Sequence, residues 1–461
     1  MSVRIAKIDC RGKDDRELSA LADLLIREDS PAESSDMRAI EDSVAAIICD
    51  VRERGDAAVL EYTERFDKAV LASDAIELSR SELDEAYERF ALEQPELLET
   101  LELAAKRIAA YHAQQQIADF SLNERKDGGE NGGIAGREAA AGVRIGQRVL
   151  PLERVGIYVP GGTAAYPSTV LMNVIPAKIA GVSEVVMVSP PDKNGELNDA
   201  VLAAAKIAGA DRVLRIGGAQ AVAALAYGTE SIPRVNKITG PGNIYVATAK
   251  KQVFGRVDID MIAGPSEILI IADDTANAKF VAADMLSQAE HDKMASAILI
   301  TDDESFAHMV EVELLNQLSE LPRAEIAEAS VENRGKIILV DNLDAALHIA
   351  NDLAPEHLEL MCDNPFEMMK KIRNAGSIFL GKYTPEPLGD YLAGPNHTLP
   401  TSGTAKFSSP LSVYDFLKRS SYIAFSREAL CDIGEHVVRF ATAEGLDAHG
   451  KAVAVRMREE K

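Results

Sequence analysis

The chain has 461 residues, of which 47% are apolar and 26% are charged, as in folded proteins that carry more than one core. Its 49 basic and 73 acidic residues leave a formal charge of −24. That balance argues against nucleic acid and against an anionic membrane surface as partners, because both attract clustered Lys and Arg. Solubility is the simplest explanation of so large a negative charge.

The first quarter of the chain has a helical pattern. Residues 42–52 and 96–106 space their apolar side chains three and four apart, which predicts amphipathic helices. Residues 126–136 follow and are rich in Gly and charge. We interpret them as a mobile loop rather than a phosphate-binding loop, because no strand precedes them and no helix clearly follows.

From about residue 154 the pattern changes to strands that alternate with Ala-rich helices such as 198–206. Two series of strands are predicted, at 155–159, 184–188, 212–216 and 268–271, and then at 297–301, 336–340 and 377–380. This alternation predicts doubly wound parallel sheets in two α/β units. The tail after about 412 has a mainly helical pattern, typical of a small separate domain or an exchanged arm.

Three Gly-bearing turns follow predicted strands in the first α/β unit, at 160–162, 217–220 and 239–243. Ligands of open α/β sheets bind at the carboxyl ends of strands, and helix N-termini there favour phosphate. A dinucleotide site is therefore plausible. The G-x-G-x-x-G fingerprint is absent, however, and ordinary tight turns between strand and helix explain the same glycines equally well.

Two pairs of residues are candidates for metal binding and acid/base chemistry. Gln288 and His291 lie three apart in the helical segment 281–291, which places them about one turn apart on one face and supplies half of a nitrogen/oxygen metal site. The adjacent Glu356 and His357 offer a carboxylate and an imidazole to an acid/base enzyme. A solvated loop is the alternative for the second pair.

The remaining histidines divide into two groups. His397, in a Gly- and Pro-containing loop, and His449, near the C-terminus, are further site candidates. The other four lie in charge-rich helical surroundings typical of solvated or packing residues: His112, His308, His348 and His436. No H-E-x-x-H or G-x-S-x-G motif is present, which argues against metalloproteases and esterases.

The cysteines and the first residues of the chain bear on its location. The four cysteines are scattered without a C-x-x-C pair, as in a reducing compartment, and Cys362 alone is a candidate reactive thiol. Residues 1–7 lack the apolar core of a signal peptide, and no apolar run approaches the roughly 18 to 20 residues of a membrane span. We therefore expect a cytoplasmic protein.

Seven sequence blocks together carry a family resemblance. They are Val155–Gly162, Gly217–Val222, Ile238–Asn243, Ala263–Glu267, Gln288–His291, Leu353–His357 and the stretch from Gly389 to Pro410. In this order they resemble the histidinol dehydrogenases, which oxidise L-histidinol to L-histidine with two NAD. The resemblance covers nearly the whole chain except the termini and residues 126–136, which look like an insertion.

The resemblance implies an α/β fold of two incomplete Rossmann-like parallel-sheet domains with helical N-terminal and C-terminal segments. The implied divisions are an N-terminal segment at 1–35, a larger α/β domain at 36–157 with 268–411, an NAD-binding domain at 158–267 and a dimer-exchange segment at 412–461. The family is homodimeric, and its C-terminal segment reaches the active site of the partner.

The resemblance also implies a zinc site and a substrate site. The positions that match the zinc ligands are Gln288, His291, Asp390 and His449. The same four positions contact substrate together with Ser266, His357 and Glu444, and His397 is expected close by. Glu444 and His449 would act on the partner's site.

The implied acid/base pair is Glu356 and His357. His357 would take the proton of the substrate hydroxyl, and Glu356 would deprotonate the water that adds to the aldehyde. The positions that match NAD contacts are Tyr158, Gln220 and Asn243.

Two rival interpretations remain. A relative with the same zinc and NAD machinery could act on another small alcohol, but Ser266 and the Glu444-x-x-x-x-His449 spacing match the substrate-recognition positions. A catalytically inactive zinc-binding or regulatory protein is the competing class, and the intact Glu356 and His357 argue against it.

Overall fold

The computed structural model describes residues 4–29, 35–123, 142–161 and 165–458. The predicted loop at 126–136 lies outside these residues. The chain divides into a larger unit, 1–115 with 152–416, and a smaller unit, 116–151 with 417–461.

The first sheet of the larger unit has five parallel strands in the order β6-β5-β4-β7-β8. They are β4 (Arg154–Tyr158), β5 (Glu184–Val188), β6 (Arg212–Leu214), β7 (Lys237–Thr239) and β8 (Asp258–Ile259). The chain adds β5 and β6 on one side of β4 and then β7 and β8 on the other. The winding therefore reverses between β4 and β7, and the carboxyl ends of these two strands form the crevice where such sheets bind ligands.

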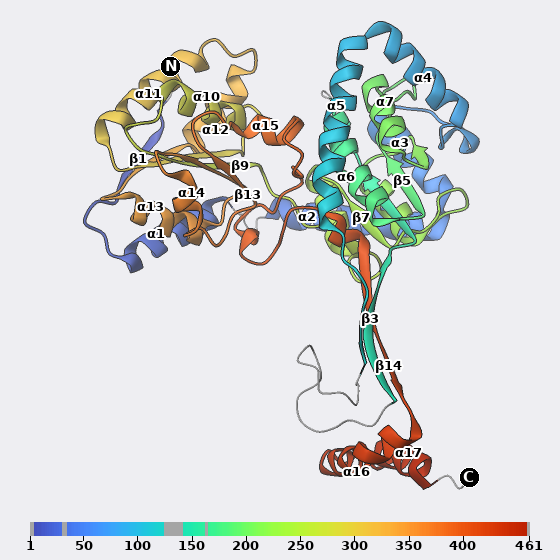
Figure 1. Cartoon of the computed structure of the whole chain (residues 1–461). Helices are drawn as coiled ribbons and strands as arrows, with labels where there is room; N and C mark the ends of the chain where they lie inside the picture. Colours follow the sequence, from blue (N-terminus) through green and yellow to red (C-terminus); the bar gives the residue numbers. More distant parts are fainter. Residues whose placement is uncertain (1–3, 30–34, 124–141, 162–164, 459–461) are drawn as a thin grey trace. The chain divides into compact units, whose positions relative to one another are not determined.

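Helices cover both faces of this sheet (Figure 1). One layer is α4 (Arg80–Glu93), α5 (Pro95–His112), α6 (Pro167–Ala180) and α7 (Asp199–Ala208), and the other is α2 (Ser35–Arg54), α3 (Asp56–Asp67), α8 (Gly218–Tyr227) and α9 (Ile244–Val253). Successive strand residues point to opposite faces, so Val185 packs in the first layer's core and Val186 in the second. Strands buried on both faces need continuous apolar runs, which is why they are readable in the sequence.

The packing of the N-terminal helices differs from the grouping implied by the resemblance, which joins 36–157 to 268–411. Apolar side chains at 44–59 and 86–108 lie instead in the two cores of the five-stranded sheet. The physical reason is that the helix pairs α2/α3 and α4/α5 complete the layers that α8/α9 and α6/α7 leave partly uncovered. The domain boundaries themselves stay a prediction.

The second sheet of the larger unit has six parallel strands in the order β1-β11-β10-β9-β12-β13. They are β1 (Ala6–Asp9), β9 (Glu267–Ala272), β10 (Ser296–Thr301), β11 (Lys336–Leu339), β12 (His357–Met361) and β13 (Ser377–Leu380). One face carries α10 (Ala278–Ala289), α11 (Glu304–Leu318) and α12 (Ala324–Asn333), and the other carries α1 (Asp15–Asp29), α13 (Leu343–Leu353) and α14 (Pro365–Met369). The predicted class of two parallel-sheet α/β units is confirmed.

The smaller unit is an antiparallel sheet followed by two helices (Figure 1). It comprises β2 (Phe120–Asn123), β3 (Val143–Pro151), β14 (Leu417–Phe425), α16 (Arg427–Ala443) and α17 (Asp447–Arg458). The prediction of a mainly helical tail after 412 is wrong for 417–425, where all nine residues pair with β3. The polar run Lys418–Ser421 at the start of this strand hides the period-two signal.

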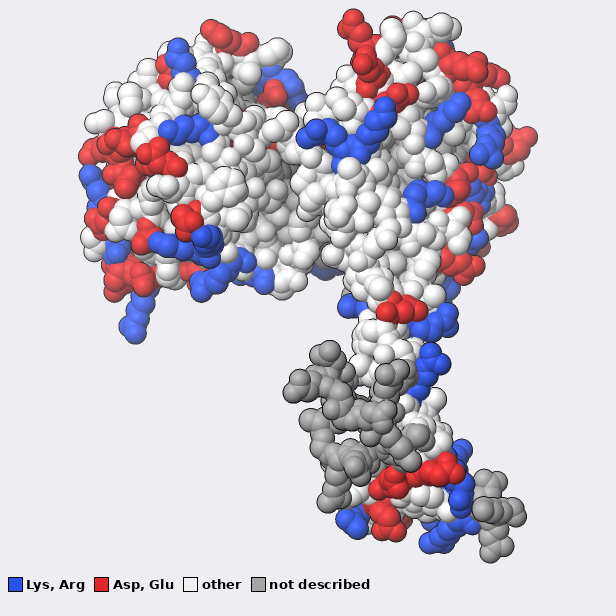
Figure 2. All heavy atoms as spheres, viewed as in Figure 1, with Lys and Arg blue, Asp and Glu red and all other residues white. Residues whose placement is uncertain are grey.

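Two features of the described residues concern surface charge and helix composition. On the face drawn in Figure 2, Lys and Arg of the described residues lie among Asp and Glu and form no continuous basic surface. Within the described ranges, none of the helices combines the length and apolarity that crossing a membrane requires.

His112, which ends α5, is predicted as a solvated or packing residue and proves to be a packing residue. It is fully buried, and its Nε2 accepts from Asn396 Nδ2 at 3.3 Å. Burial lowers the pKa of His112 to about 4. Because the unfolded chain keeps a pKa near 6.5, it binds more protons than the folded chain between these values, so acid favours unfolding.

We expect His112→Gln to lower the acid sensitivity of the protein. Between pH 7.5 and pH 5 the buried imidazole costs about 2 kcal/mol of stability, or roughly 2 °C in Tm for a chain of this length. Thermal scans at the two pH values should show a smaller drop in the variant than in the wild type. His308→Gln, at an exposed site, is the control, and equal slopes in all three proteins would contradict the prediction.

Candidate active site

Glu356 and His357 lie at the amino end of β12, between β9 and β13. Glu356 is 6% exposed and His357 4%, so the alternative of a solvated loop is wrong. The sequence did not predict this strand, because Glu359 interrupts its apolar run.

Both side chains bind the backbone of Glu267 on the neighbouring strand. Glu356 Oε2 accepts from Glu267 N at 2.9 Å, and His357 Nδ1 lies 2.8 Å from Glu267 O. A carbonyl oxygen can only accept, so Nδ1 carries the hydrogen and Nε2 of the neutral ring keeps its lone pair. The β-sheet therefore fixes both the orientation of the imidazole and the nitrogen that can take a proton.

A group of acids faces this free nitrogen. Glu386 and Asp390 lie one turn apart on α15 (Glu386–Tyr391), and their carboxylate oxygens and a ring nitrogen of His357 lie within 4.8 Å of one another. Asp390 is a predicted ligand. Glu386, which is buried and 3.6 Å from His357 Nε2, was missed. The four-residue spacing of two acids directly after Pro385 is the signal that could have found it.

Gln288 lies in the last turn of α10 and is fully buried. Among the described residues its amide oxygen and nitrogen have no hydrogen-bond partner, and such a buried polar group is costly unless a ligand satisfies it. One turn earlier, Asp284 shares a hydrogen bond with Glu359 of β12, so this face of α10 is turned toward the β12 strand.

His291 does not lie on the helix with Gln288 as predicted. The helix ends at Ala289, and His291 follows in a turn in which its backbone N–H donates to Gln288 O at 3.2 Å. The imidazole still belongs to the same neighbourhood, because His291 and His397 both lower the pKa of His357.

The electrostatics of the cluster favour a cation. Burial raises the pKa of Glu356 well above its usual range, and the carboxylates of Glu267, Asp390 and Glu386 add to the shift. Burial and Asp390 raise the pKa of Glu386 to about 9. In the described part of the chain neither Lys nor Arg forms an ion pair with Glu356, Glu386 or Asp390. A divalent ion would supply the missing positive charge and reverse these shifts.

The other predicted substrate positions have different surroundings. Ser266 directly precedes β9 at the same sheet edge, and its carbonyl accepts from Ser296 N. His397 Nδ1 lies 3.1 Å from the backbone oxygen of Asp390. Glu444 follows α16 and His449 lies in α17, both exposed within the smaller unit.

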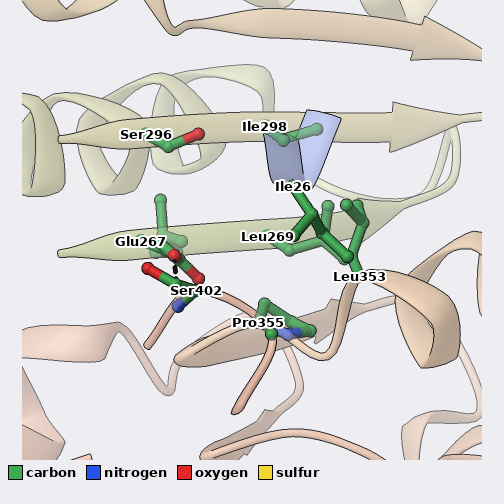
Figure 3. Close-up of a pocket in the computed structure, with 10 residues that line it drawn as sticks. Ile26, Glu267, Leu269, Ser296, Ile298, Leu353, Pro355 and Ser402 are labelled. Atoms are coloured by element: carbon green, nitrogen blue, oxygen red, sulfur yellow. Dashed lines mark hydrogen bonds between the residues drawn. The ribbon is translucent and has the colours of Figure 1, made fainter. Parts of the chain in front are cut away.

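A cavity of about 20 Å³ lies beside Glu267 and is lined mainly by aliphatic side chains from the strands and from Ile26, Leu353 and Pro355 (Figure 3). Ser402 N donates to Glu267 Oε1 at 2.7 Å at its edge. This volume holds about one water molecule. The cavity therefore belongs to the packing around Glu267 and is too small for an amino-alcohol substrate.

A second candidate site lies at the carboxyl ends of β4, β6 and β7, where the three Gly-bearing turns follow their strands. Tyr158 ends β4, and its hydroxyl accepts from Gly218 N at 3.0 Å. Gln220 is fully buried, with an amide that lacks a partner among the described side chains and backbone. The Asn243 side-chain oxygen caps α9 by accepting from the N–H groups of Tyr245 and Val246.

Tyr158 ends one and Asn243 follows the other of the two strands at the reversal point of the five-stranded sheet, and Gln220 lies in the first turn of α8, whose Gly218 N donates to the Tyr158 hydroxyl. Backbone N–H groups at helix N-termini bind phosphate, and the unpartnered amide of Gln220 can bind a further polar group. The arrangement therefore fits a dinucleotide without the usual glycine fingerprint.

Comparisons with known proteins agree on one family. A family model described as histidinol dehydrogenase matches residues 30–457. A histidinol dehydrogenase of Syntrophotalea carbinolica is 52% identical over 441 residues, covering 96% of this chain and 97% of the relative. One of Geobacter metallireducens is 54% identical over 423 residues, covering 92% and 93%.

A solved structure gives the same result. The crystal structure of histidinol dehydrogenase from Elizabethkingia anophelis has a TM-score of 0.88 and 36% identity, and each chain is covered to 99%. Because sequence, family model and fold all agree over almost the whole length, the chain belongs to the histidinol dehydrogenase family of oxidoreductases.

Proposed function

We propose that this chain is a zinc-dependent dehydrogenase that oxidises L-histidinol to L-histidine through histidinal, with two NAD, as the last step of histidine biosynthesis. The observation that carries the proposal is the buried pair of Glu356 and His357, held on Glu267 beside the carboxylates of α15. The names of relatives with about half of their residues identical support the substrate.

His357 is the base of the first oxidation. Burial lowers its pKa to about 4, so the ring is neutral at neutral pH and Nε2 can accept a proton. Removing the hydroxyl proton of the alcohol allows the carbon to release hydride, which yields the aldehyde.

Glu356 is the base of the second oxidation. The aldehyde must add water before its carbon can release a second hydride, and a carboxylate with a raised pKa is suited to take the proton of that water. The hydrate then loses hydride and a proton to give the acid. This route requires no cysteine thioester, in agreement with the raised pKa and burial of Cys362.

Gln288, His291 and Asp390 would hold the zinc, together with His449 from a second subunit. The unpartnered amide of Gln288 supports this site. Asp390 also belongs to a second group of nitrogen and oxygen donors, with His357 and Glu386, whose donor atoms lie within 4.8 Å of one another, and such donors suit zinc. The ion, when bound, would orient and polarise the substrate. Ser266, His357 and Glu444 would contact histidinol directly.

Tyr158, Gln220 and Asn243 of the five-stranded α/β unit would hold NAD, which would supply the hydride acceptor. The unpartnered Gln220 amide and the adjacent helix N-termini support this placement.

The protein would work as a cytoplasmic homodimer. Large apolar side chains of the smaller unit support an interface between subunits: Ile423 is 71% exposed, Phe440 73% and Val455 61%. Glu444 and His449 would reach the partner's site through this interface.

Counting NADH against substrate tests the function. With zinc present, the chain should form two NADH for each histidinol consumed and release histidine, and removal of zinc by a chelator should stop the reaction. The measurement is NADH absorbance alongside product analysis. Turnover of another small alcohol with no turnover of histidinol would assign the chain to a related activity instead.

A further inference from the structure

The turn after β7 is held by a buried ion pair that the proposed chemistry does not use. Lys250 of α9 and Asp260, which follows β8, have side chains that are 3% and 1% exposed and contact each other through Nζ and Oδ1. Buried charges of this kind are costly unless they are paired and fully hydrogen-bonded.

This pair binds both polar groups of one peptide residue, Gly240. Lys250 Nζ donates to Gly240 O at 2.9 Å, and Gly240 N donates to Asp260 Oδ2 at 2.8 Å. The other oxygen of Asp260 accepts from Met261 N at 2.7 Å. Because the N–H and the C=O of Gly240 are both fixed, the orientation of the peptide planes on either side of it is fixed too.

Gly240 is in close contact with the end of β4. Its φ is +108°, and a Cβ there would lie 2.1 Å from Tyr158 O, so only glycine fits. Three residues later Asn243 begins α9. A movement of Gly240 would therefore displace the cap residue Asn243 and alter the contact with Tyr158, at the point where the sheet reverses its winding.

We propose that Lys250 and Asp260 are positioning residues for NAD: they hold the Gly240 turn so that Asn243 and the N-terminus of α9 are already in place when the dinucleotide binds. A preorganised site binds more tightly, because it does not have to be ordered on binding. This inference rests on the proposed use of NAD.

Lys237 offers a matched control. It is a second buried lysine of the same α/β unit, 6% exposed, and it pairs with Asp258 at 3.1 Å and Asp415 at 3.4 Å. It begins β7, however, and so lies at the amino end of the strand, opposite the Gly240 turn.

The test is NAD binding to the full-length protein by calorimetry. The double substitution Lys250→Met with Asp260→Asn removes both charges with little change in volume, and it should raise the Kd for NAD about tenfold or more. Lys237→Met should leave that Kd within about twofold. Without NAD, amide hydrogen exchange across 238–245 should be faster in the double variant than in Lys237→Met.

An unchanged Kd in a folded double variant, or an equal rise in Lys237→Met, would overturn the inference. If the double variant does not fold, Asp260→Asn alone keeps the lysine contact and must still weaken NAD more than Lys237→Met does. Failure of the wild type to bind NAD would remove the proposed cofactor and this inference together. If the wild type binds NAD tightly and the variants bind it equally well, the positioning role of Lys250 and Asp260 is refuted while the proposed use of NAD stands.

Discussion

Replacing Glu356 by Gln should separate the two oxidations. The variant is expected to form the aldehyde and the first NADH, and to make histidine about 10² to 10⁴ times more slowly. The reason is that Gln keeps the shape and a hydrogen-bond acceptor for Glu267 N, but it cannot take a proton from water. Single-turnover NADH formation with product analysis measures each step.

The pH dependence gives a second measure of the same role. Burial and three neighbouring carboxylates raise the pKa of Glu356. A divalent ion in the site would lower this pKa again. In the wild type the second oxidation should slow as pH falls through the pKa that Glu356 has in the zinc-bound enzyme, because the protonated acid is no longer a base. The variant has no such group and should lose this part of the pH profile.

Glu359→Gln is the matched control, because Glu359 is a buried glutamate on the same strand whose carboxylate accepts from Glu386 N at 2.9 Å, whereas that of Glu356 accepts from Glu267 N. A general disturbance of the strand would slow both oxidations, whereas loss of the water-activating base slows only the second. Undiminished histidine output from Glu356→Gln would refute the role given to this residue.

The parallel-sheet architecture was readable from the sequence because strands buried on both faces have continuous apolar runs. The strand Ile268–Ile271 is one example. β12 was not readable, because Glu359 and the buried pair at its start are polar. Strand prediction from a local pattern depends on buried apolar side chains, so it fails for a strand that buries polar groups.

The rule that open parallel sheets bind ligands at the carboxyl ends of their strands predicts the position of one candidate site but not of the other. The turns around Tyr158, Gln220 and Asn243 lie at the carboxyl ends of the strands, where the rule for open sheets places ligands. Glu356 and His357 lie at the amino ends of the strands of their sheet, which is the edge opposite to the one where the same rule places ligands.

The hydrogen-bond partners of the proposed catalytic pair could not be predicted from local spacing either. The hydrogen bonds from Glu356 and His357 to Glu267 span 89 and 90 residues of sequence. Only the packed sheet brings them together. The Gln288-x-x-His291 spacing predicted that both residues lie on one helical face, and this local geometry is wrong because the helix ends at Ala289, between them.

Mixing two inactive variants should restore activity if the sites are shared between subunits. His449→Ala lacks the proposed zinc ligand of the smaller unit, and His357→Ala lacks the base of the larger unit. In a mixed dimer with exchanged C-terminal segments, one site regains both histidines and the other has neither. Such a dimer should have about half of the wild-type activity, because the two sites of a symmetric dimer are equivalent.

A reciprocal mixed dimer controls for any effect of the two substitutions on folding or expression. It pairs a wild-type subunit with one that carries both His357→Ala and His449→Ala. With exchanged segments each of its sites lacks one histidine, so it should be inactive, whereas without exchange one site would be intact. Each of the two mixed dimers carries one His357→Ala and one His449→Ala substitution. They differ only in whether these substitutions lie on different subunits or on the same one. An active reciprocal dimer beside an inactive first one would therefore show that each subunit completes its own site.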